Sequence, residues 1–406
     1  MNILFLSHYF PPEVNAPATR TYEHCKHWVA LGHEVTVVCC VPHHPMGRVF
    51  PGYKNKIVQV ERRDGIRVVR ILTYVAANRG VLKRTLNYVF YMLAAVVAAP
   101  FLGRADIVLS TSPQFFNGLA GFFVSRLKRA PWILEIRDLW PSSIASLGAV
   151  ETPIWIRLLE RLESFVYHKA DFVVPLTNAF RSHILARGGS PDAIEVIPNG
   201  FDLSGETDIA PPDSLIRSLS LENKFVAAYF GTHGMAHGLE TILNAAELLR
   251  AHRNIVFLFA GDGAERESLE RLCNEKGLSN VLMIGQKPKE MMPVLWAIAD
   301  VSLVVLRRLE VFKTVVPSKI FEAMAAKVPI ILAVEGEAAE LLKAARAGVC
   351  IKPEDATALA DTILELSKRP KQCLEFGQNG LVYVKKYHSR RKFAERYEMI
   401  MKKLQN

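Results

Sequence analysis

Residues 317–331 contain the side chains of this sequence that are best suited to bind a diphosphate. Proline is favoured at the first helical position, so Pro317 predicts a helix start there, where free N–H groups and the macrodipole attract an anion. Ser318 and Lys319 would lie in its first turn, and Glu322 would follow on nearly the same face. We expect Lys319 and Ser318 to contact phosphates and Glu322 to hold a ribose diol. The alternative is an amphipathic helix whose charges are only solvated.

Two glycine-rich loops follow predicted strands in the same half of the chain. Open α/β sheets bind ligands at the carboxyl ends of their strands, so both loops are candidates for phosphate contact. His233 and His237 are four residues apart, a spacing that could indicate a metal pair on a helix. However, the surrounding glycines disfavour a helix, and no glutamate follows His233. We therefore predict no metal. The expected donor contacts in these loops are Thr232, His233, His237, Gly261 and Gly263.

In the first half of the chain, Asp138 follows the predicted strand 132–136 and is flanked by Arg137. Charges at the carboxyl end of an apolar strand indicate either a site or a buried ion pair. We predict that Asp138 is the carboxylate nearest the reacting group, with Glu13 as its substitute. The alternative is that Asp138 only caps a turn or pairs with Arg137.

Two further loops leave predicted strands at the same edge of this first sheet. The loop after the first strand leads into a helix, which is a common place for phosphate contact. The loop after the second strand carries paired histidines close to Arg48. We expect these loops to bind a second substrate, the acceptor, through Glu13, Asn15, Arg20, His43 and His44.

The chain has 406 residues, half of them apolar and 22% charged, which predicts a globular protein of two domains. Its net charge of +10 favours anionic partners such as nucleotides or an acidic membrane surface, and no nucleic-acid-binding signature is present. Six scattered cysteines and a first segment that lacks the features of a signal peptide predict a cytoplasmic protein with free thiols.

Short apolar runs alternate with longer amphipathic segments, which predicts βαβ units with parallel sheets. An Asp-Gly turn within 62–69 predicts a hairpin. The expected strands are 3–7, 34–41, 106–110, 132–136, 172–175 and 193–197, then 225–230, 255–260, 281–284, 301–306, 329–333 and 348–351. We expect domains at 1–198 and 199–386, with the helix at 387–406 returning to the first domain.

The segment 86–102 breaks this pattern because it contains no charge and a single asparagine. It has 17 residues with Pro100 near its end, which is short for a membrane-spanning helix of about 20. Two interpretations remain open. The helix is buried between layers, or one face enters the membrane interface while Arg79, Lys83, Arg84 and Arg104 contact anionic lipid.

Taken together, these motifs resemble the GT-B glycosyltransferases of family 4 over nearly the whole chain. The resemblance is carried by Asn199-Gly200-Phe201-Asp202, by Gly261-Asp262-Gly263 and by the segment from Pro317 to Pro329, with Lys327 where glycine is usual. More narrowly, residues 137–141 and 313–319 resemble bacterial fucosyl- and N-acetylfucosaminyl-transferases of O-antigen and capsule assembly. The family implies two Rossmann-like domains and a retaining, metal-independent transfer without a cofactor.

The sequence departs from the family pattern at the basic and acidic positions of the donor site. The first glutamate of the family's acidic pair would fall at Thr314, and its Arg and Lys would fall near Thr232 and His237. We infer that Lys319, with Lys313, supplies the missing positive charge and that Lys319 acts in catalysis.

The resulting expectation is an enzyme that moves a sugar from UDP- or GDP-sugar to a polyprenyl-diphosphate-linked saccharide at the inner face of the cell membrane. The alternative is a sugar-nucleotide 2-epimerase of the same architecture, which needs neither an acceptor nor a membrane.

Overall fold

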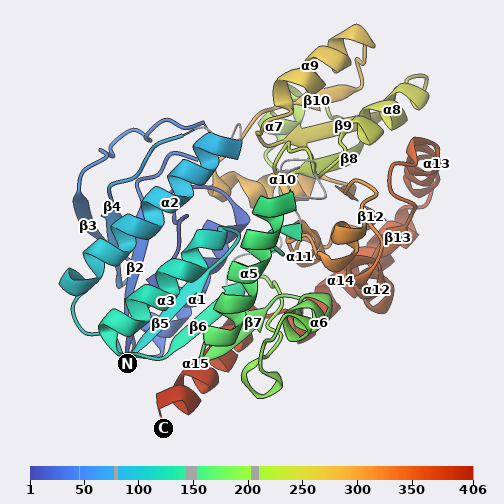
Figure 1. The fold of residues 1–406 in the computed structure, drawn as a ribbon. Coiled ribbons are helices and arrows are strands. Elements are labelled where there is room, and N and C mark those ends of the chain that lie inside the picture. Colours follow the sequence, from blue (N-terminus) through green and yellow to red (C-terminus); the bar gives the residue numbers. More distant parts are fainter. Residues whose placement is uncertain (45, 77–80, 143–152, 203–209, 406) are drawn as a thin grey trace. The chain divides into compact units, whose positions relative to one another are not determined.

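The computed structural model describes residues 1–406 except 45, 77–80, 143–152, 203–209 and 406, and Figure 1 shows its fold. The chain divides into two compact units. The first unit consists of Met1–Asn199 together with Arg390–Asn406, and the second consists of Gly200–Ser389. The expected boundaries, after 198 and after 386, lie close to these divisions. Each unit is an α/β layer structure built on its own sheet.

The first unit has a seven-stranded sheet in the order β3-β4-β2-β1-β5-β6-β7, parallel except that β3 pairs antiparallel with β4. The chain reverses its direction of strand addition between β1 and β5, where doubly wound sheets bind ligands. Asp64 and Gly65, both with positive φ, form the expected hairpin turn. The strands are β1 (Asn2–Leu6), β2 (Glu34–Cys40), β3 (Val58–Arg63), β4 (Ile66–Ile71), β5 (Ile107–Thr111), β6 (Trp132–Ile136) and β7 (Phe172–Pro175).

Helices cover this sheet, and the last helix of the chain is one of them. In α15, the backbone carbonyl of Ala394 accepts a hydrogen bond from the Trp28 ring of α1, and Arg390 pairs with Glu23 at 2.9 Å. Three further helices, α2, α3 and α5, lie side by side (Figure 1). The helices are α1 (Ala16–Ala30), α2 (Val81–Ala98) with the 3-10 turn Ala99–Leu102, α3 (Phe115–Lys128), α5 (Pro153–Lys169), α6 (Asn178–Ala186) and α15 (Arg390–Gln405).

The second unit has a six-stranded parallel sheet in the order β10-β9-β8-β11-β12-β13. The order in which the chain adds strands to this sheet reverses between β8 and β11, although the two strands run parallel. The strands are β8 (Phe225–Phe230), β9 (Ile255–Ala260), β10 (Val281–Met283), β11 (Val301–Val305), β12 (Ile330–Ala333) and β13 (Gly348–Cys350). The helices are α7 (Asp213–Ser218), α8 (Glu240–Leu248), α9 (Arg266–Glu275), α10 (Met292–Ile298), α11 (Lys319–Ala325), α12 (Glu337–Ala345), α13 (Ala356–Ser367) and α14 (Pro370–Tyr387).

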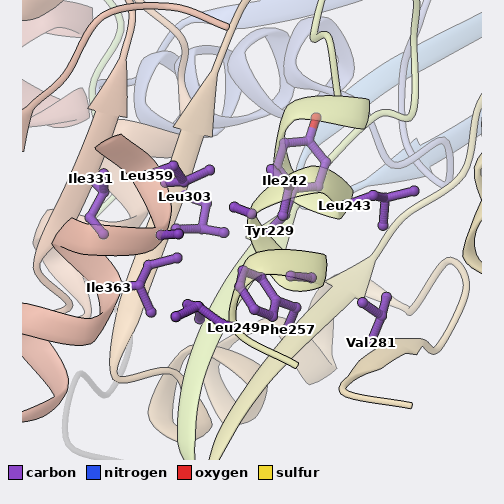
Figure 2. Close-up of a cluster of buried hydrophobic side chains, with 14 of the residues drawn as sticks. Tyr229, Ile242, Leu243, Leu249, Phe257, Val281, Leu303, Ile331, Leu359 and Ile363 are labelled. Carbon is purple, nitrogen blue, oxygen red and sulfur yellow. The ribbon is translucent and has the colours of Figure 1, made fainter. Parts of the chain in front are cut away.

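Alternate residues of neighbouring strands form the core of the second unit (Figure 2). Phe257 and Leu303 project from β9 and β11 onto the side chains of α8 and α13, and both are fully buried. Burial of each such side chain contributes about 1.5–3 kcal/mol. The apolar run of each strand thus fixes the sheet, and the sheet fixes the loops at its carboxyl edge.

One expected strand does not form. Residues 193–197 follow a 3-10 turn at Pro191–Ala193, and Ile194 makes only an isolated bridge to Val173. The N–H groups of Glu195 and Ile197 bond to the carbonyls of Val173 and Pro175, so the segment runs along the free edge of β7 without forming a full strand. The two-sheet α/β fold expected from the alternating pattern is confirmed.

Candidate active site

The helix that was expected to bind an anion begins two residues later than predicted. Helix α11 starts at Lys319 and has seven residues, with Ser318 as its N-cap and Pro317 outside it. The N–H groups of Ile320 and Phe321 already bond to the carbonyls of Pro317 and Ser318. Two amides of the expected anion cradle are therefore already bonded within the chain, and the Ser318 hydroxyl makes no capping bond. The charge on Lys319 is the feature that remains.

The Lys319 ammonium lies at the centre of a cluster in the second unit. Its Nζ is 3.7 Å from the centre of the Tyr229 ring at the end of β8, and is buried with no hydrogen-bond partner among the described residues. Burial lowers its pKa to about 7, against the raising effect of Glu322 one turn later. Near neutral pH this lysine is poised between its charged and uncharged forms.

Two neutral histidines stand beside this lysine. Burial, together with the charge of Lys319, lowers the pKa of His233 to about 4 and that of His237 to about 3. Neither ring nitrogen of His233 has a hydrogen-bond partner within the described parts of the chain, while Nδ1 of His237 lies 3.2 Å from the Gly234 carbonyl. Within those same parts, no third His, Cys, Asp or Glu completes a metal site. The histidines can instead offer neutral hydrogen bonds to a ligand.

The two glycine-rich loops pack backbone against backbone. A Cβ at Gly261 would lie 1.8 Å from the Gly231 carbonyl oxygen, and one at Gly263 would lie 2.3 Å from that of His233. The His233 N–H also bonds to the Asp262 carbonyl at 2.9 Å. The glycines expected to contact the donor therefore hold the loop that carries His233.

Two other expected donor residues have different surroundings from those predicted. The Lys313 ammonium is paired with Glu310 at 2.6 Å and with Glu335 at 3.6 Å, so its charge is already balanced. The prediction that it shares the phosphate charge is not supported by this geometry. The Thr232 side chain is exposed, and its carbonyl accepts a hydrogen bond from the Tyr229 hydroxyl at 2.7 Å. Among the described residues, Lys319 is thus a cation of this cluster that has no hydrogen-bonded partner.

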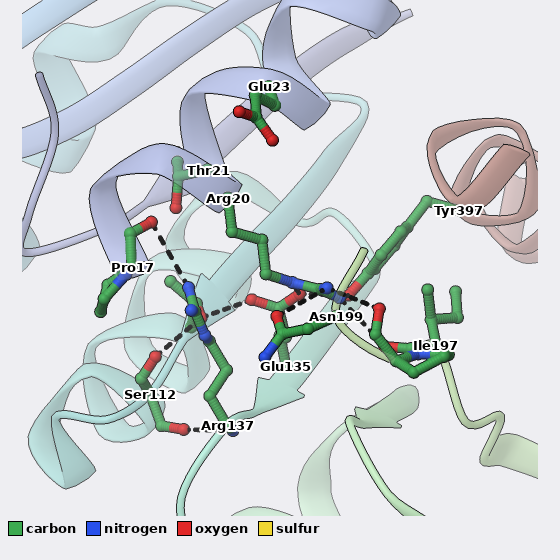
Figure 3. A network of polar contacts seen from close by, with 12 residues as sticks. Pro17, Arg20, Thr21, Glu23, Ser112, Glu135, Arg137, Ile197, Asn199 and Tyr397 are labelled. Carbon is green, nitrogen blue, oxygen red and sulfur yellow. Dashed lines mark hydrogen bonds and ion pairs between the residues drawn. The ribbon is translucent and has the colours of Figure 1, made fainter. Parts of the chain in front are cut away.

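In the first unit, Arg20 is a structural residue, which corrects its predicted role in acceptor binding (Figure 3). It is 1% exposed and its Nε bonds to Glu135 at 2.8 Å. Its five N–H donors are all used, the other acceptors being the carbonyls of Ile197 and Pro198, Asn199 Oδ1 and the Tyr397 hydroxyl. No donor is left for a ligand.

Glu135 is the carboxylate that this network surrounds. Burial alone would raise its pKa, but Arg20, Arg137 and hydrogen bonds from Thr111 and Tyr397 lower it to about 2. Burial in turn lowers the pKa of Arg137 to about 9. The Arg137 guanidinium donates a hydrogen bond of 3.4 Å from Nη1 to the Pro17 carbonyl (Figure 3). This bond connects the network to the residues just before Arg20.

Asp138, the predicted reacting carboxylate, is half-buried beyond this network. Burial lowers the pKa of Arg84 on α2, but Tyr88, Tyr9 and Asp138 together raise it above its ordinary value. Asp138 therefore lies within electrostatic range of Arg84. The two remaining predicted residues, His43 and His44, lie with Arg84 around a pocket that is also lined by Tyr9, Asn87 and Tyr88.

Two residues predicted to bind the acceptor instead hold backbone segments in place. Glu13 is 2% exposed and accepts backbone hydrogen bonds from His43 at 3.1 Å and His44 at 2.9 Å. Burial raises its pKa to about 7. The Asn15 side chain caps α1 by accepting from the Ala18 N–H at 2.9 Å. Both side chains hold loops, which corrects their predicted roles.

Sequence reasoning missed the pocket residues that come from α2. Asn87 is the single asparagine of the apolar run 86–102, and a polar residue there needs a hydrogen-bond partner when buried. Arg84 lies one turn before it and Tyr88 follows it. The lone asparagine was the available signal that one face of this helix lines a polar space.

The chain matches two families that divide it between them. Residues 15–200 match the glycosyl transferase 4-like domain, and residues 213–382 match glycosyl transferases group 1. Over 91% of its length the chain is 24% identical to WcaI of Escherichia coli strain K12, named as a colanic acid biosynthesis glycosyl transferase, and covers 93% of it. It is 29% identical to the glycosyltransferase WbjE of Pseudomonas aeruginosa, over 65% of this chain and 66% of that protein.

Solved structures share the fold at low sequence identity. Sucrose-phosphate synthase from Thermosynechococcus elongatus superposes with a TM-score of 0.78 and 18% identity, covering 99% of this chain and 98% of that one. HepE of Anabaena in complex with UDP-glucose superposes with a TM-score of 0.71 and 17% identity, covering 99% and 100%. At this identity the likeness establishes the fold.

Proposed function

Because the chain is a group 1 glycosyltransferase with the GT-B fold, taking a sugar from a nucleotide-sugar, we propose that its acceptor is a polyprenyl-diphosphate-linked saccharide at the membrane. The transfer retains the configuration of the sugar and belongs to surface polysaccharide synthesis. The name of WcaI supports this setting. The sequence resemblance favours fucose or N-acetylfucosamine as the sugar.

The observation that carries the donor assignment is the unpaired Lys319 ammonium at the carboxyl end of β8. A buried cation without a hydrogen-bonded partner costs free energy, and a diphosphate would supply that partner. Glu322, one turn along α11, is then placed to accept from the ribose hydroxyls. HepE, solved with UDP-glucose, supports a uridine nucleotide, with a guanosine nucleotide as the alternative.

The same cluster suits the departure of a nucleoside diphosphate. Negative charge grows on the leaving diphosphate in the transition state, and a preorganised cation in a site of low dielectric stabilises that charge. Lys319 supplies the cation, and His233 offers a neutral hydrogen-bonding ring next to it. Asp138 of the first unit is our candidate for the carboxylate that acts at the sugar.

The proposed membrane contact rests on α2. Leu82–Leu102 is the one described helical segment long and apolar enough to cross a bilayer, and 33% of it is buried. It connects β4 and β5 of a single sheet, so it cannot cross and instead lies along the domain surface. Its most exposed apolar side chains are Leu82 (73%), Leu86 (48%), Leu93 (57%), Val97 (70%) and Phe101 (82%).

Neighbouring helices extend this apolar surface. Phe123 and Leu127 of α3 and Trp155 of α5 are also exposed, at 48%, 55% and 59%. A contiguous apolar surface with basic residues around it is suited to the interface of an anionic membrane. We propose that α2, α3 and α5 hold the protein at the inner face of the cell membrane.

The test is donor turnover with and without acceptor. UDP and GDP are first compared for their ability to raise the melting temperature, since a ligand that binds the folded state stabilises it. Nucleoside diphosphate release from the matching nucleotide-sugar is then followed with vesicles that carry or lack a polyprenyl-diphosphate-linked saccharide. Release that depends on this acceptor supports the proposal.

The alternative of a sugar-nucleotide 2-epimerase predicts a different outcome. An epimerase would convert the nucleotide-sugar without any lipid and would release no sugar to an acceptor. Both matched families are transferase families, which disfavours this alternative.

A further inference from the structure

Strand β3 is the outer strand of the first sheet, and no strand of the described chain pairs with its far side (Figure 1). An open edge offers unpaired N–H and C=O groups to another chain, and proteins usually protect it with proline, with lysine or with a covering segment. The strand reads Val-Gln-Val-Glu-Arg-Arg, with neither proline nor lysine. Val58 and Val60 are 47% and 52% exposed, so the centre of this edge is open.

Alternate residues of β3 turn their backbone groups toward the open edge. The Leu72 N–H bonds to the Ile57 carbonyl at 3.0 Å, so Ile57 turns its own groups toward β4. Inward and outward residues alternate along an antiparallel pair, so Ile57 sets the pattern for the strand that follows it. Val58, Val60 and Arg62 therefore direct both their N–H and C=O groups away from β4.

The exposed valines lie on the face of the sheet that α2 covers. Val58 and Val60 lie opposite Ile71 and Val69 of β4, which are 2% and 1% exposed. In the same row of β4, Arg67 donates a hydrogen bond of 3.5 Å to the carbonyl that ends the 3-10 turn after α2. The open edge therefore carries apolar side chains on the α2 side of the sheet.

The strand is complementary to a second copy of itself in one antiparallel register. With a two-fold axis at Val60, this valine meets the partner's Val60, and Gln59 meets the partner's Glu61. Lys56, just before the strand, approaches the partner's Asp64, and both of these side chains are exposed. Apolar and opposite-charge pairs across two strands are the pairs that stabilise a sheet.

Charge disfavours the neighbouring registers. A two-fold axis at Gln59 places Arg62 opposite the partner's Lys56, and an axis at Glu61 places two glutamates opposite each other. Like charges that lie directly opposite each other destabilise a strand pair. The register centred on Val60 is therefore the one that the side chains select.

We propose that two copies of this chain associate through β3, edge to edge and antiparallel, about a two-fold axis at Val60. The two seven-stranded sheets then form one continuous sheet. Because this axis is perpendicular to the sheet, α2 of both copies lies on the same side, where both apolar surfaces can contact one membrane. The inference goes beyond the proposed function, and the self-association does not depend on the membrane contact.

Sedimentation equilibrium of the whole protein without lipid measures this association. Wild type should form a dimer. Val60→Lys and Val60→Glu should each weaken dimerisation by about tenfold or more, because each places like charges opposite each other at the axis. An equimolar mixture of the two variants should regain the dimer, because the new charges are then opposite in sign. Val382→Lys, at a valine of α14 that is 56% exposed, is the control and should dimerise like wild type.

A wild type that stays monomeric at its highest soluble concentration would overturn the proposal. A dimer that persists in Val60→Lys, or a mixture of the two variants that stays monomeric, would also overturn it. Melting temperature and nucleotide affinity report that the variants are folded. If the Val60 variants do not fold, Lys56→Glu, which opposes the partner's Asp64, takes their place, and an unchanged dimer then counts against the interface.

Discussion

The Lys319 ammonium and the Tyr229 ring lie 3.7 Å apart, and the ring is the contact that takes the place of a hydrogen bond for this cation in the described chain. A cation–π contact contributes about 0.5–2 kcal/mol, less than the full cost of removing an ammonium from water. The pKa of Lys319 therefore falls to about 7. This single relationship leads to a pH dependence of donor binding.

Nucleoside diphosphate binding should be linked to proton uptake by Lys319. The bound anion favours the charged lysine, so its pKa in the complex lies above the value of about 7 in the free protein. Affinity should be highest below pH 7 and should fall as pH rises toward the pKa of the complex. His233, His237 and Glu322 interact electrostatically with Lys319, and both histidines titrate at lower pH.

Calorimetry at pH 7.5–8 in buffers of different ionisation enthalpy measures this uptake directly. Lys319→Met should remove both the proton uptake and the fall in affinity. Binding without proton exchange in the wild type would contradict the assignment.

The Arg20–Glu135 pair should be important for stability and not for ligand binding. Arg20→Gln leaves a buried carboxylate without its ion pair, which costs about 3–5 kcal/mol. Urea unfolding of the first unit measures the change in free energy. The control is Arg104→Gln, whose partner is Asp106 and whose side chain is 84% exposed, with an expected cost below about 1 kcal/mol. Equal effects of the two changes would argue against the buried network.

Asp138→Asn should remove most transfer activity while leaving nucleotide affinity unchanged. The substitution keeps the shape of the side chain and removes the charge that we assign to the reacting sugar. Turnover and calorimetric affinity are measured on the same preparation. A rate close to wild type would mean that Asp138 is a structural neighbour of Arg84 and not a catalytic residue.

The exposed apolar face of α2 should be needed for membrane binding and not for folding. Leu86→Ser combined with Leu93→Ser removes two side chains that are 48% and 57% exposed, each able to contribute up to about 1.5–3 kcal/mol on burial in lipid. Co-sedimentation with anionic vesicles should fall while the melting temperature stays constant. Leu374→Ser, at a leucine of α14 that is 75% exposed, should bind vesicles like wild type.

The fold could be predicted from sequence because each strand is a short apolar run between amphipathic helices. Lys319 could be selected because its residue type and its place in the chain already suggest anion binding. The structural role of Arg20 could not be predicted from sequence. Its partner Tyr397 lies 377 residues away along the chain, on a helix that belongs to the same unit. A local pattern that contains a buried arginine does not distinguish a ligand contact from an internal ion pair.

The most direct test of the account is the affinity of Lys319→Met for UDP and GDP, measured by calorimetry at pH 7. We predict that one of the two nucleotides binds wild type, and that Lys319→Met and Glu322→Ala each lose about 1.5–3 kcal/mol of binding free energy, the scale of hydrogen bonds to charged groups. Lys313→Met, at a lysine already paired with Glu310, should lose no more than about twofold. A folded Lys319→Met protein that binds the nucleotide as tightly as wild type would contradict the central claim.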